Sequence, residues 1–344
     1  MQKGCRFGVH RVVEPKGTLP QAAIKIDNTP EIYSNELLID VKTLNIDSAS
    51  FTQIKKACNH DQDKMKKMIL DIVRNRGKMQ NPVTGSGGML IGTVKEIGPD
   101  FNDSNLKVGD KIATLVSLSL TPLLIKEIKE IKVFNDQVDV LATAILFESG
   151  IYSILPDDLP ETLALAALDV AGAPAQVNKL VKQNDTVVIV GAAGKSGILC
   201  TYQAMKNAGP KGNVIAVVIN EEQKTLLESL NLATTIVIAD ATKPTEVYEK
   251  IVDVTNGELS DVTINVVNVE NTEMSCILST KDTGTVYFFS MATSFTKAAL
   301  GAEGVGSDVN MIIGNGYTRH HADLTLNLIR ESKPIRQLLE KLYV

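Results

Sequence analysis

Short runs of apolar residues recur through the second half of the chain, and stretches with helical spacing separate them. The most continuous run, Val187–Val190, reads Val-Val-Ile-Val and predicts a strand buried on both faces of a sheet. Strands that alternate with helices over units of about 30 residues predict a parallel, doubly wound α/β sheet. Further strands are expected at residues 214–219, 235–238, 261–267, 285–289 (after a turn at 281–284) and 309–313, and helices at 160–168, 198–207, 221–230, 245–255 and about 335–343.

The first part of the chain has a different pattern, in which strand-like runs and turn residues follow one another closely. From Asp61 to Arg76, apolar residues fall at helical spacing among lysines and acids, which predicts an amphipathic helix packed on a core. We therefore expect a β-rich, barrel-like domain over residues 1–155 and a Rossmann domain over residues 156–344. The strands of the first domain are expected within residues 22–26, 37–43, 89–97 and 106–115.

Three glycines follow the strand Val187–Val190 and precede a helix-compatible run. In a dinucleotide-binding unit, Gly191 would make the tight turn, Gly194 would let the backbone approach a pyrophosphate, and Gly197 would allow close helix–strand packing. The segment Gly-Ala-Ala-Gly-Lys-Ser also resembles a P-loop, but a P-loop needs four residues between its glycines, and here only two intervene. The turn therefore favours a dinucleotide, with the expected cofactor-binding residues Gly191, Ala193, Gly194, Lys195, Ser196 and Gly197.

Composition and charge narrow the classes of function. A chain of 344 residues with 44% hydrophobic and 22% charged residues is long enough for two globular cores. The formal net charge of −5 gives no basic surface for nucleic acid, and no apolar run is long enough to cross a membrane. The four cysteines are scattered, without a CxxC pair, which fits a reduced cytoplasm and argues against structural zinc.

Several stretches of the sequence resemble those of known protein families. The segments 92–98 and 106–113 resemble the barrel signature of the medium-chain dehydrogenase/reductase superfamily, and the glycine turn resembles that of its quinone-reductase-like branch. Within the superfamily the chain is most similar to the family of L-erythro-3,5-diaminohexanoate dehydrogenases. The strings that carry this closer resemblance lie at residues 45–52, 81–88, 169–175, 288–306 and 314–317.

The chain departs from the zinc-dependent members of the superfamily at the positions that hold their metal. Those members use a Cys in the loop that matches residues 46–50, a His-Glu pair near 85–88, and a third ligand before the cofactor domain. Here the corresponding places hold Asp47, Ser86 and, approximately, Asp169. Zinc prefers Cys and His ligands, so we expect an enzyme without a metal. His60 lies near the first loop and is expected to face solvent.

The resemblance implies oxidation of the 3-amino group of L-erythro-3,5-diaminohexanoate, as in lysine fermentation. The products would be 5-amino-3-oxohexanoate, ammonia and NAD(P)H. This chemistry needs a base for the ammonium proton and an anion for the second ammonium. Asp47 and Asp169 are the first candidates, with a helix N-cap and a helix-end position as the structural alternatives. Ser86 joins this set, and Glu148, an acid in an apolar stretch, would either bind an ammonium or pair structurally with a lysine.

The end of the second Rossmann strand bears on the choice of cofactor. NAD-specific sites usually place Asp or Glu there for the ribose hydroxyl, whereas this chain has Val218. No charge would oppose a 2′-phosphate, so NADP or dual use of NADP and NAD is expected. Lys224 could help to bind that phosphate, or it could be an ordinary charge on the face of a helix. The remaining candidates for cofactor contact are Asn220, Lys224, Asn268 and Ser290.

Two other classes of protein fit the same fold. A zinc-independent, NADPH-dependent quinone or enone reductase would use the same glycine turn but would need no acids for ammonium groups. A non-catalytic NAD(P)-binding protein is the second alternative. By analogy with the superfamily, which joins two Rossmann sheets through the sixth strand, a homodimer is expected.

Overall fold

The computed structural model describes residues 1–314 and 316–343 of the chain. The fold divides into two compact units, Met1–Leu165 and Ala166–Val344. Helix α3 (Glu161–Leu168) runs across this division, and the boundary expected from the sequence lay between residues 155 and 156. Within the described residues, no helix combines the length and the apolar character that crossing a bilayer requires.

The first unit is built on a six-stranded antiparallel sheet with the strand order β6-β7-β3-β4-β5-β8. Its central strand β3 pairs with β7 from Glu36–Phe147 at one end to Asn45–Gln137 at the other. A separate two-stranded ribbon joins β1 and β2. The strands are β1 (Val12–Glu14), β2 (Lys25–Ile26), β3 (Glu36–Asn45), β4 (Met89–Ile97), β5 (Lys111–Thr114), β6 (Leu123–Lys132), β7 (Gln137–Phe147) and β8 (Tyr152–Ile154).

Two helices complete the core of this unit. Helix α2 (Gln62–Arg76) begins after Asp61, which caps its N-terminus, and ends at Gly77, which has a left-handed φ of 71°. Its buried stripe packs with the apolar face of helix α1 (Ser48–Ala57) against residues of β3, β4 and β7. The predicted helix at 61–76 and the strand at 89–97 are confirmed, whereas α1 and the hairpin of β6 and β7 were not anticipated.

The second unit contains a parallel six-stranded sheet with the order β11-β10-β9-β12-β13-β14. This order changes direction between β9 and β12, and ligands of open α/β sheets bind outside the carboxyl ends of the strands at such a point. The predicted parallel sheet is confirmed. Its strands are β9 (Thr186–Val190), β10 (Asn213–Val218), β11 (Thr235–Ile238), β12 (Ser260–Asn265), β13 (Thr280–Phe288) and β14 (Asn310–Ile313).

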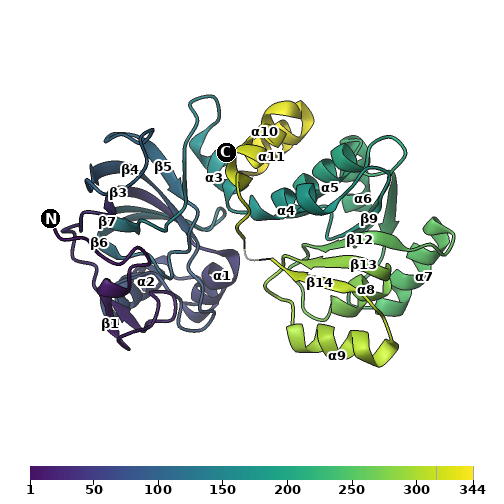
Figure 1. Ribbon diagram of the computed structural model, residues 1–344, viewed down its shortest axis with the longest axis horizontal. Helices are drawn as coiled ribbons and strands as arrows, with labels where there is room; N and C mark the ends of the chain where they lie inside the picture. The colour runs from purple at the N-terminus through teal and green to yellow at the C-terminus, as the bar shows by residue number, and fades with distance from the viewer. Residues whose placement is uncertain (315, 344) are drawn as a thin grey trace. The chain divides into compact units, whose positions relative to one another are not determined.

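Helices cover both faces of this sheet (Figure 1). Helices α4, α5 and α10 pack together on one side, while α7, α8 and α9 form the other layer. Alternate strand residues such as Val188 and Val190 form a core with α7 to α9, which leaves the other face of β9 to α5. The helices are α4 (Gly172–Leu180), α5 (Lys195–Ala208), α6 (Glu221–Ser229), α7 (Pro244–Thr255), α8 (Glu273–Leu278), α9 (Phe295–Val305), α10 (His321–Glu331) and α11 (Lys333–Tyr343).

One local prediction for this unit is wrong. The turn expected at residues 281–284 lies inside strand β13. Thr283 has a left-handed φ of 63°, and the pairing with β12 shifts between Ser260 and Val262, so the strand continues through an irregularity. Helices α8, α9 and α10 were not predicted.

Candidate functional site

The turn between β9 and α5 has a geometry that requires glycine at two of its three glycine positions. Gly191 has a left-handed φ of 88°, and a β-carbon there would lie 2.8 Å from the β-carbon of Val267. A β-carbon on Gly197 would lie 2.2 Å from the carbonyl oxygen of Gly191. At Gly194 the nearest atom would be 3.6 Å away, so the space beside it is open. The turn therefore forms a tight cradle with one open position.

Helix α5 begins directly after this open position. Its N-cap is Gly194, which has no side chain to cap the helix. The N–H groups at the start of a helix and the helix dipole favour an anion there. The open space and the uncapped helix end fit the pyrophosphate of a dinucleotide, with Ala193 and Ser196 in the same turn.

Lys195, the first residue of α5, is bound to Asp169. The Nζ atom of Lys195 donates to Oδ2 of Asp169 over 2.8 Å, and the two side chains are 20% and 27% exposed. Asp169 follows directly after α3, as the structural alternative for this residue anticipated. The sequence suggested both residues separately, for a phosphate and for an ammonium, and the structure joins them.

The end of β10 carries the residues proposed for the cofactor's ribose. The side chain of Val218 is only 2% exposed, whereas that of the next residue, Ile219, is 52% exposed. Asn220 caps α6 by accepting from the N–H of Gln223 over 2.9 Å. Lys224 lies 4.0 Å from a carboxylate oxygen of Glu221 and 4.0 Å from one of Glu228, which is a helix-face arrangement.

Two more cofactor candidates follow strands β12 and β13. Because parallel strands end at the same edge of the sheet, Asn268 and Ser290 lie on the edge that carries Gly191. Asn268 is exposed, and Ser290 Oγ accepts from the N–H of Ala292. The loop after β13 also holds a buried Thr293 Oγ1 that has no hydrogen-bond partner among the described residues. Sequence reasoning did not single out Thr293.

In the first unit, Asp47 caps helix α1 with one carboxylate oxygen. Its Oδ1 accepts from the N–H of Ser50 over 3.0 Å, as the structural alternative anticipated. Its Oδ2 is buried and has no hydrogen-bond partner among residues 1–314 and 316–343. A buried, unsatisfied carboxylate oxygen is costly, so this atom marks a position where a cation or a proton donor would bind favourably.

The loop at residues 81–88 lies against Asp47. A β-carbon on Gly88 would be 1.9 Å from the carbonyl oxygen of Asn45 and 2.7 Å from the N atom of Asp47. Ser50 Oγ lies 2.5 Å from Thr84 Oγ1, which in turn accepts from the N–H of Ser86 over 3.3 Å. The structure thus brings together Asp47 and Ser86, two candidates that are far apart in the sequence. Ser50 and Thr84 connect them and were missed, although both lie in strings that carry the resemblance.

Glu148 does not join this cluster. It follows β7 at the end where Phe147 pairs with Glu36, whereas Asp47 follows the opposite end of the ten-residue strand β3. Its Oε2 accepts from Nδ2 of Asn35 over 2.9 Å, which gives it a structural partner, although an amide instead of the lysine considered above.

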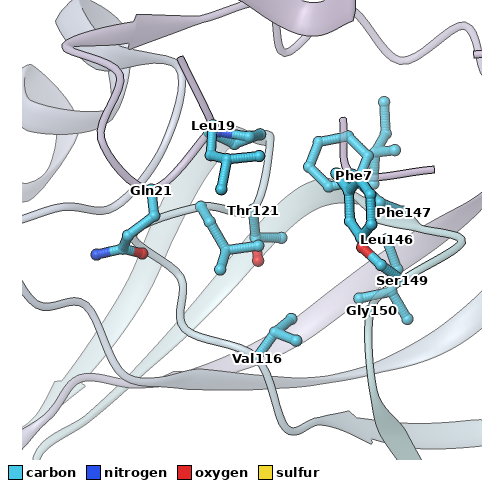
Figure 2. Close-up of a pocket in the computed structure, with 12 residues that line it drawn as sticks. Phe7, Leu19, Gln21, Val116, Thr121, Leu146, Phe147, Ser149 and Gly150 are labelled. Carbon is cyan, nitrogen blue, oxygen red and sulfur yellow. The ribbon is translucent and has the colours of Figure 1, made fainter. Parts of the chain in front are cut away.

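A pocket of about 190 Å³ is lined in part by Phe147 and Ser149, the two sequence neighbours of Glu148. Phe7 and Phe147 lie at one side of it and Leu19 at the other, with Val116 and Thr121 between them (Figure 2). Among the described residues, those that line this pocket are all uncharged. A diamino acid with two ammonium groups and a carboxylate would find no ionic partner in it.

The described residues contain no group of three or more His, Cys, Asp or Glu side chains placed to hold a metal ion. His60 is exposed, as expected. His321, the first residue of α10, is buried, and its ring meets Tyr317 edge-on with centroids 5.3 Å apart. Burial lowers the pKa of His321, so this histidine favours its neutral form. Asn315, within one of the strings noted above, lies outside the described residues.

Comparison with solved structures identifies the class of fold. An alcohol dehydrogenase from Thermotoga maritima superposes with a TM-score of 0.56 at 16% identity, over 90% of this chain and 85% of its own. A mycobacterial protein in complex with NADPH gives a TM-score of 0.56 at 18% identity, over 96% of this chain and 95% of its own. The chain, with its antiparallel N-terminal sheet and its parallel sheet, therefore shares the fold of these proteins.

Comparison with known sequences identifies the family. Residues 10–156 match the L-erythro-3,5-diaminohexanoate dehydrogenase N-terminal domain. The chain is 62% identical to the L-erythro-3,5-diaminohexanoate dehydrogenase of Acetoanaerobium sticklandii, over 99% of this chain and 100% of that protein. It is 61% identical to the enzyme of the same name from Fusobacterium nucleatum, over the full length of both. The chain belongs to the L-erythro-3,5-diaminohexanoate dehydrogenase family.

Proposed function

We propose that the protein oxidises L-erythro-3,5-diaminohexanoate with NADP or NAD, releasing 5-amino-3-oxohexanoate and ammonia. The observation that carries this proposal is the identity of 61–62% along the whole chain to enzymes of that name. The balanced reaction consumes one diamine, one oxidised cofactor and one water. It releases one amino-oxo acid, one ammonium ion, one reduced cofactor and one proton.

The glycine turn and the first turn of α5 are the residues that would hold the cofactor. The cradle of Gly191 and Gly197, the open position at Gly194 and the start of α5 directly after it support this assignment. When bound, the nicotinamide supplies the acceptor for the two electrons that leave the carbon bearing the 3-amino group.

Asp47 is the residue that we propose as the base. The 3-ammonium must lose a proton before its carbon can be oxidised, and Oδ2 of Asp47 is a buried oxygen without a hydrogen-bond partner. Oδ1 is already engaged by the N–H of Ser50, which leaves Oδ2 for the substrate. Ser86, linked to Asp47 through Ser50 and Thr84, would orient the substrate or the water that hydrolyses the imine.

Asp169 is proposed as the anchor of the second ammonium group. Its carboxylate already binds one ammonium, that of Lys195, so the site has the charge and the size for such a group. Glu148 is left out of the proposal because Asn35 engages it at the opposite end of β3 from Asp47.

The residues near the ribose support use of NADP or of both cofactors. Neither Val218 nor Ile219 is acidic, and Asn220 at the N-terminus of α6 carries no charge. Lys224 is shared between two glutamates, so it contributes less to binding a phosphate than an unengaged lysine would.

The test is an assay for the absorbance of reduced nicotinamide with the purified diamine and each oxidised cofactor in turn. Formation of reduced cofactor together with an equal amount of ammonia would support the proposal. An absorbance that stays flat with both cofactors would overturn it. Oxidation of NADPH by quinones or enones in that case would select the reductase alternative, and cofactor binding without any turnover would select the non-catalytic one.

We further propose that the reaction needs no metal. The places of the superfamily's zinc ligands hold two carboxylates and a serine, and Asp169 is engaged by Lys195. Treatment with a strong chelator followed by metal analysis would test this point. Full activity in a sample with far less than one zinc per chain is expected, and loss of activity that zinc restores would contradict it.

A homodimer through strand β14 is also proposed. This strand is the edge of its sheet, and the side chains of Met311 and Ile313 on it are 37% and 54% exposed. An apolar edge strand favours pairing with another copy of the same strand. Light scattering is expected to give the mass of two chains for the wild type and a shift towards one chain for Ile313→Lys.

A further inference from the structure

The ion pair of Lys195 and Asp169 joins two parts of the proposed site that the proposed function treats separately. Lys195 Nζ lies 2.8 Å from Asp169 Oδ2, and neither side chain is fully buried, so solvent and ligands reach the pair. Lys195 belongs to the turn proposed for the pyrophosphate, and Asp169 is the proposed ammonium anchor. A ligand that binds Lys195 must therefore compete with Asp169, and a ligand that binds Asp169 must compete with Lys195.

The lysine stands at an unusual place for a cation. It is the first residue of α5, where the helix dipole favours negative charge, so an ammonium here needs an anion close by. In the structure that anion is Asp169. A pyrophosphate at the same helix end would supply further negative charge, and phosphate oxygens are strong acceptors for a lysine ammonium.

The two partners differ in how freely they can move. The segment after Asp169 is held tightly, since a β-carbon on Gly172 would lie 2.4 Å from the carbonyl oxygen of Gly316. Thr325 Oγ1 donates to the carbonyl oxygen of Ala171 over 3.3 Å. Lysine, in contrast, carries its ammonium on a flexible four-carbon stem. When a phosphate attracts the ammonium, the lysine moves and the aspartate stays.

We propose that this pair couples the binding of the cofactor to the binding of the diamine. In the free protein Lys195 neutralises Asp169. The bound pyrophosphate draws the lysine ammonium to itself, and the carboxylate of Asp169 becomes available to the substrate's second ammonium group. One ammonium replaces another at Asp169, so the carboxylate stays paired. This inference rests on the proposed function and adds to it a coupling between the two ligands.

Coupling of this kind is reciprocal, so it is measurable from either ligand. The reduced cofactor NADPH and the diamine cannot react with each other, which allows their equilibrium binding to be measured together. The dissociation constant of NADPH is obtained from its fluorescence, and that of the diamine from calorimetry with and without saturating NADPH. In the wild type, NADPH should tighten binding of the diamine by about tenfold, within the usual range of such couplings.

Three variants separate the proposal from a structural role of the pair. Lys195→Met should weaken NADPH at least fivefold and should bind the diamine equally well with and without NADPH. Asp169→Asn should bind NADPH more tightly than the wild type, because the competitor for Lys195 is gone. Lys206→Met is the matched control, since Lys206 lies near the other end of α5 and pairs with Glu331. It should leave both dissociation constants unchanged.

The results also separate this inference from the proposed function. If Asp169→Asn binds NADPH no more tightly than the wild type, or if Lys195→Met keeps the tenfold effect of NADPH on the diamine, the coupling is refuted even though turnover persists. If the wild type neither binds nor oxidises the diamine, the proposed substrate is wrong. In that case the competition of Asp169 for Lys195 is still decided by the NADPH titrations alone. Thermal unfolding of each variant establishes that it is folded.

Discussion

The carbonyl oxygen of Gly191 lies 2.2 Å from the position that a β-carbon would take on Gly197 and 3.6 Å from the corresponding position on Gly194. The distance to this one backbone oxygen thus distinguishes two kinds of glycine in the same turn. At Gly197 the protein itself leaves no room for a side chain. At Gly194 the fold tolerates a methyl group, so the absence of a side chain there leaves space for a ligand.

This difference predicts opposite effects of two identical substitutions. Gly197→Ala should lower the free energy of unfolding by roughly 2 kcal/mol or more, because backbone must move to relieve the overlap. Gly194→Ala should leave stability within about 1 kcal/mol and weaken NADPH at least tenfold, because its methyl group points into the space proposed for the pyrophosphate. Urea unfolding and fluorescence titration measure the two effects. Unchanged affinity in Gly194→Ala would place the pyrophosphate elsewhere.

The parallel sheet was predictable because strands buried on both faces are continuous apolar runs, as Val187–Val190 illustrates. Strand β6 escaped prediction for the opposite reason. Its sequence Leu-Leu-Ile-Lys-Glu-Ile-Lys-Glu-Ile-Lys lacks alternation, and the structure shows register shifts in its pairing with β7 after Ile125 and Ile128. Bulges place apolar residues three apart on one face, a pattern that resembles a helix.

The candidate site was predictable to the extent that it depends on local geometry. The glycine turn and the cap at Asp47 follow from residues within a few positions of one another. The pairing of Asp169 with Lys195 spans 26 positions and depends on how α3, α4 and α5 pack, so no local pattern contains it. Likewise, the surrounding atoms must be known before one can tell that Asp47 Oδ2 and Thr293 Oγ1 are buried without a hydrogen-bond partner among the described residues.

Asp47 and Asp61 form a natural comparison, since each caps a helix of the first unit. Asparagine is as good an N-cap as aspartate, so Asp47→Asn and Asp61→Asn should each change stability by less than about 1 kcal/mol. Only Asp47→Asn removes the proposed base, so its turnover should fall by about 10²-fold to 10⁴-fold. Steady-state assays and thermal unfolding test this. Equal activity of the two variants would remove Asp47 from the mechanism.

Glu36 should contribute to stability in a pH-dependent way. It is buried and binds Arg11 through two hydrogen bonds of 2.7 and 2.6 Å. Burial alone would raise the pKa of Glu36, but hydrogen bonds from Arg11, His10 and the N–H of Tyr33 lower it from 4.5 to about 2. Because the pKa is lower in the folded state, the stabilisation is complete above pH 4.5 and is lost as the pH falls towards 2.

The matching variant is Glu36→Gln, which keeps the shape of the side chain and cannot ionise. It should be less stable than the wild type by roughly 3 kcal/mol at neutral pH, because buried Arg11 loses its buried counter-charge. Asp27, whose carboxylate lies 3.7 Å from Arg11 and is about half exposed, remains as a weaker partner. The difference should shrink as the pH falls from 4.5 towards 2. A difference that is constant over this interval in urea unfolding would show that the charge of Glu36 contributes nothing.

Lys78 should also make stability rise with pH, but at the alkaline end. It is fully buried, and its ammonium donates to the carbonyl oxygen of Pro20 over 2.6 Å. No carboxylate among the described residues raises its pKa. Burial lowers its pKa from 10.5 to about 8. The folded state therefore releases this proton first, and the contribution of Lys78 to stability rises between pH 8 and 10.5.

The buried thiols of Cys200 and Cys276 have a pKa raised by burial, so they lower stability at high pH and mask the rise in the wild type. The comparison with Lys78→Met removes this common background. The wild type should gain stability relative to the variant by about 1 to 3 kcal/mol across the interval. A constant difference between the two proteins would contradict the lowered pKa.

Ile219 is the position at which the cofactor preference should be reversible. An acidic residue in place of Val218 would be buried, because Val218 is only 2% exposed. Ile219, at the same strand end, is 52% exposed. A carboxylate at residue 219 would accept from a ribose hydroxyl and repel a 2′-phosphate. Ile219→Asp should therefore weaken NADPH relative to NADH by more than tenfold, and Ile219→Asn, which has the same shape without the charge, should not. Fluorescence titration of both reduced cofactors decides the point, and an unchanged ratio in Ile219→Asp would mean that the ribose lies away from this strand end.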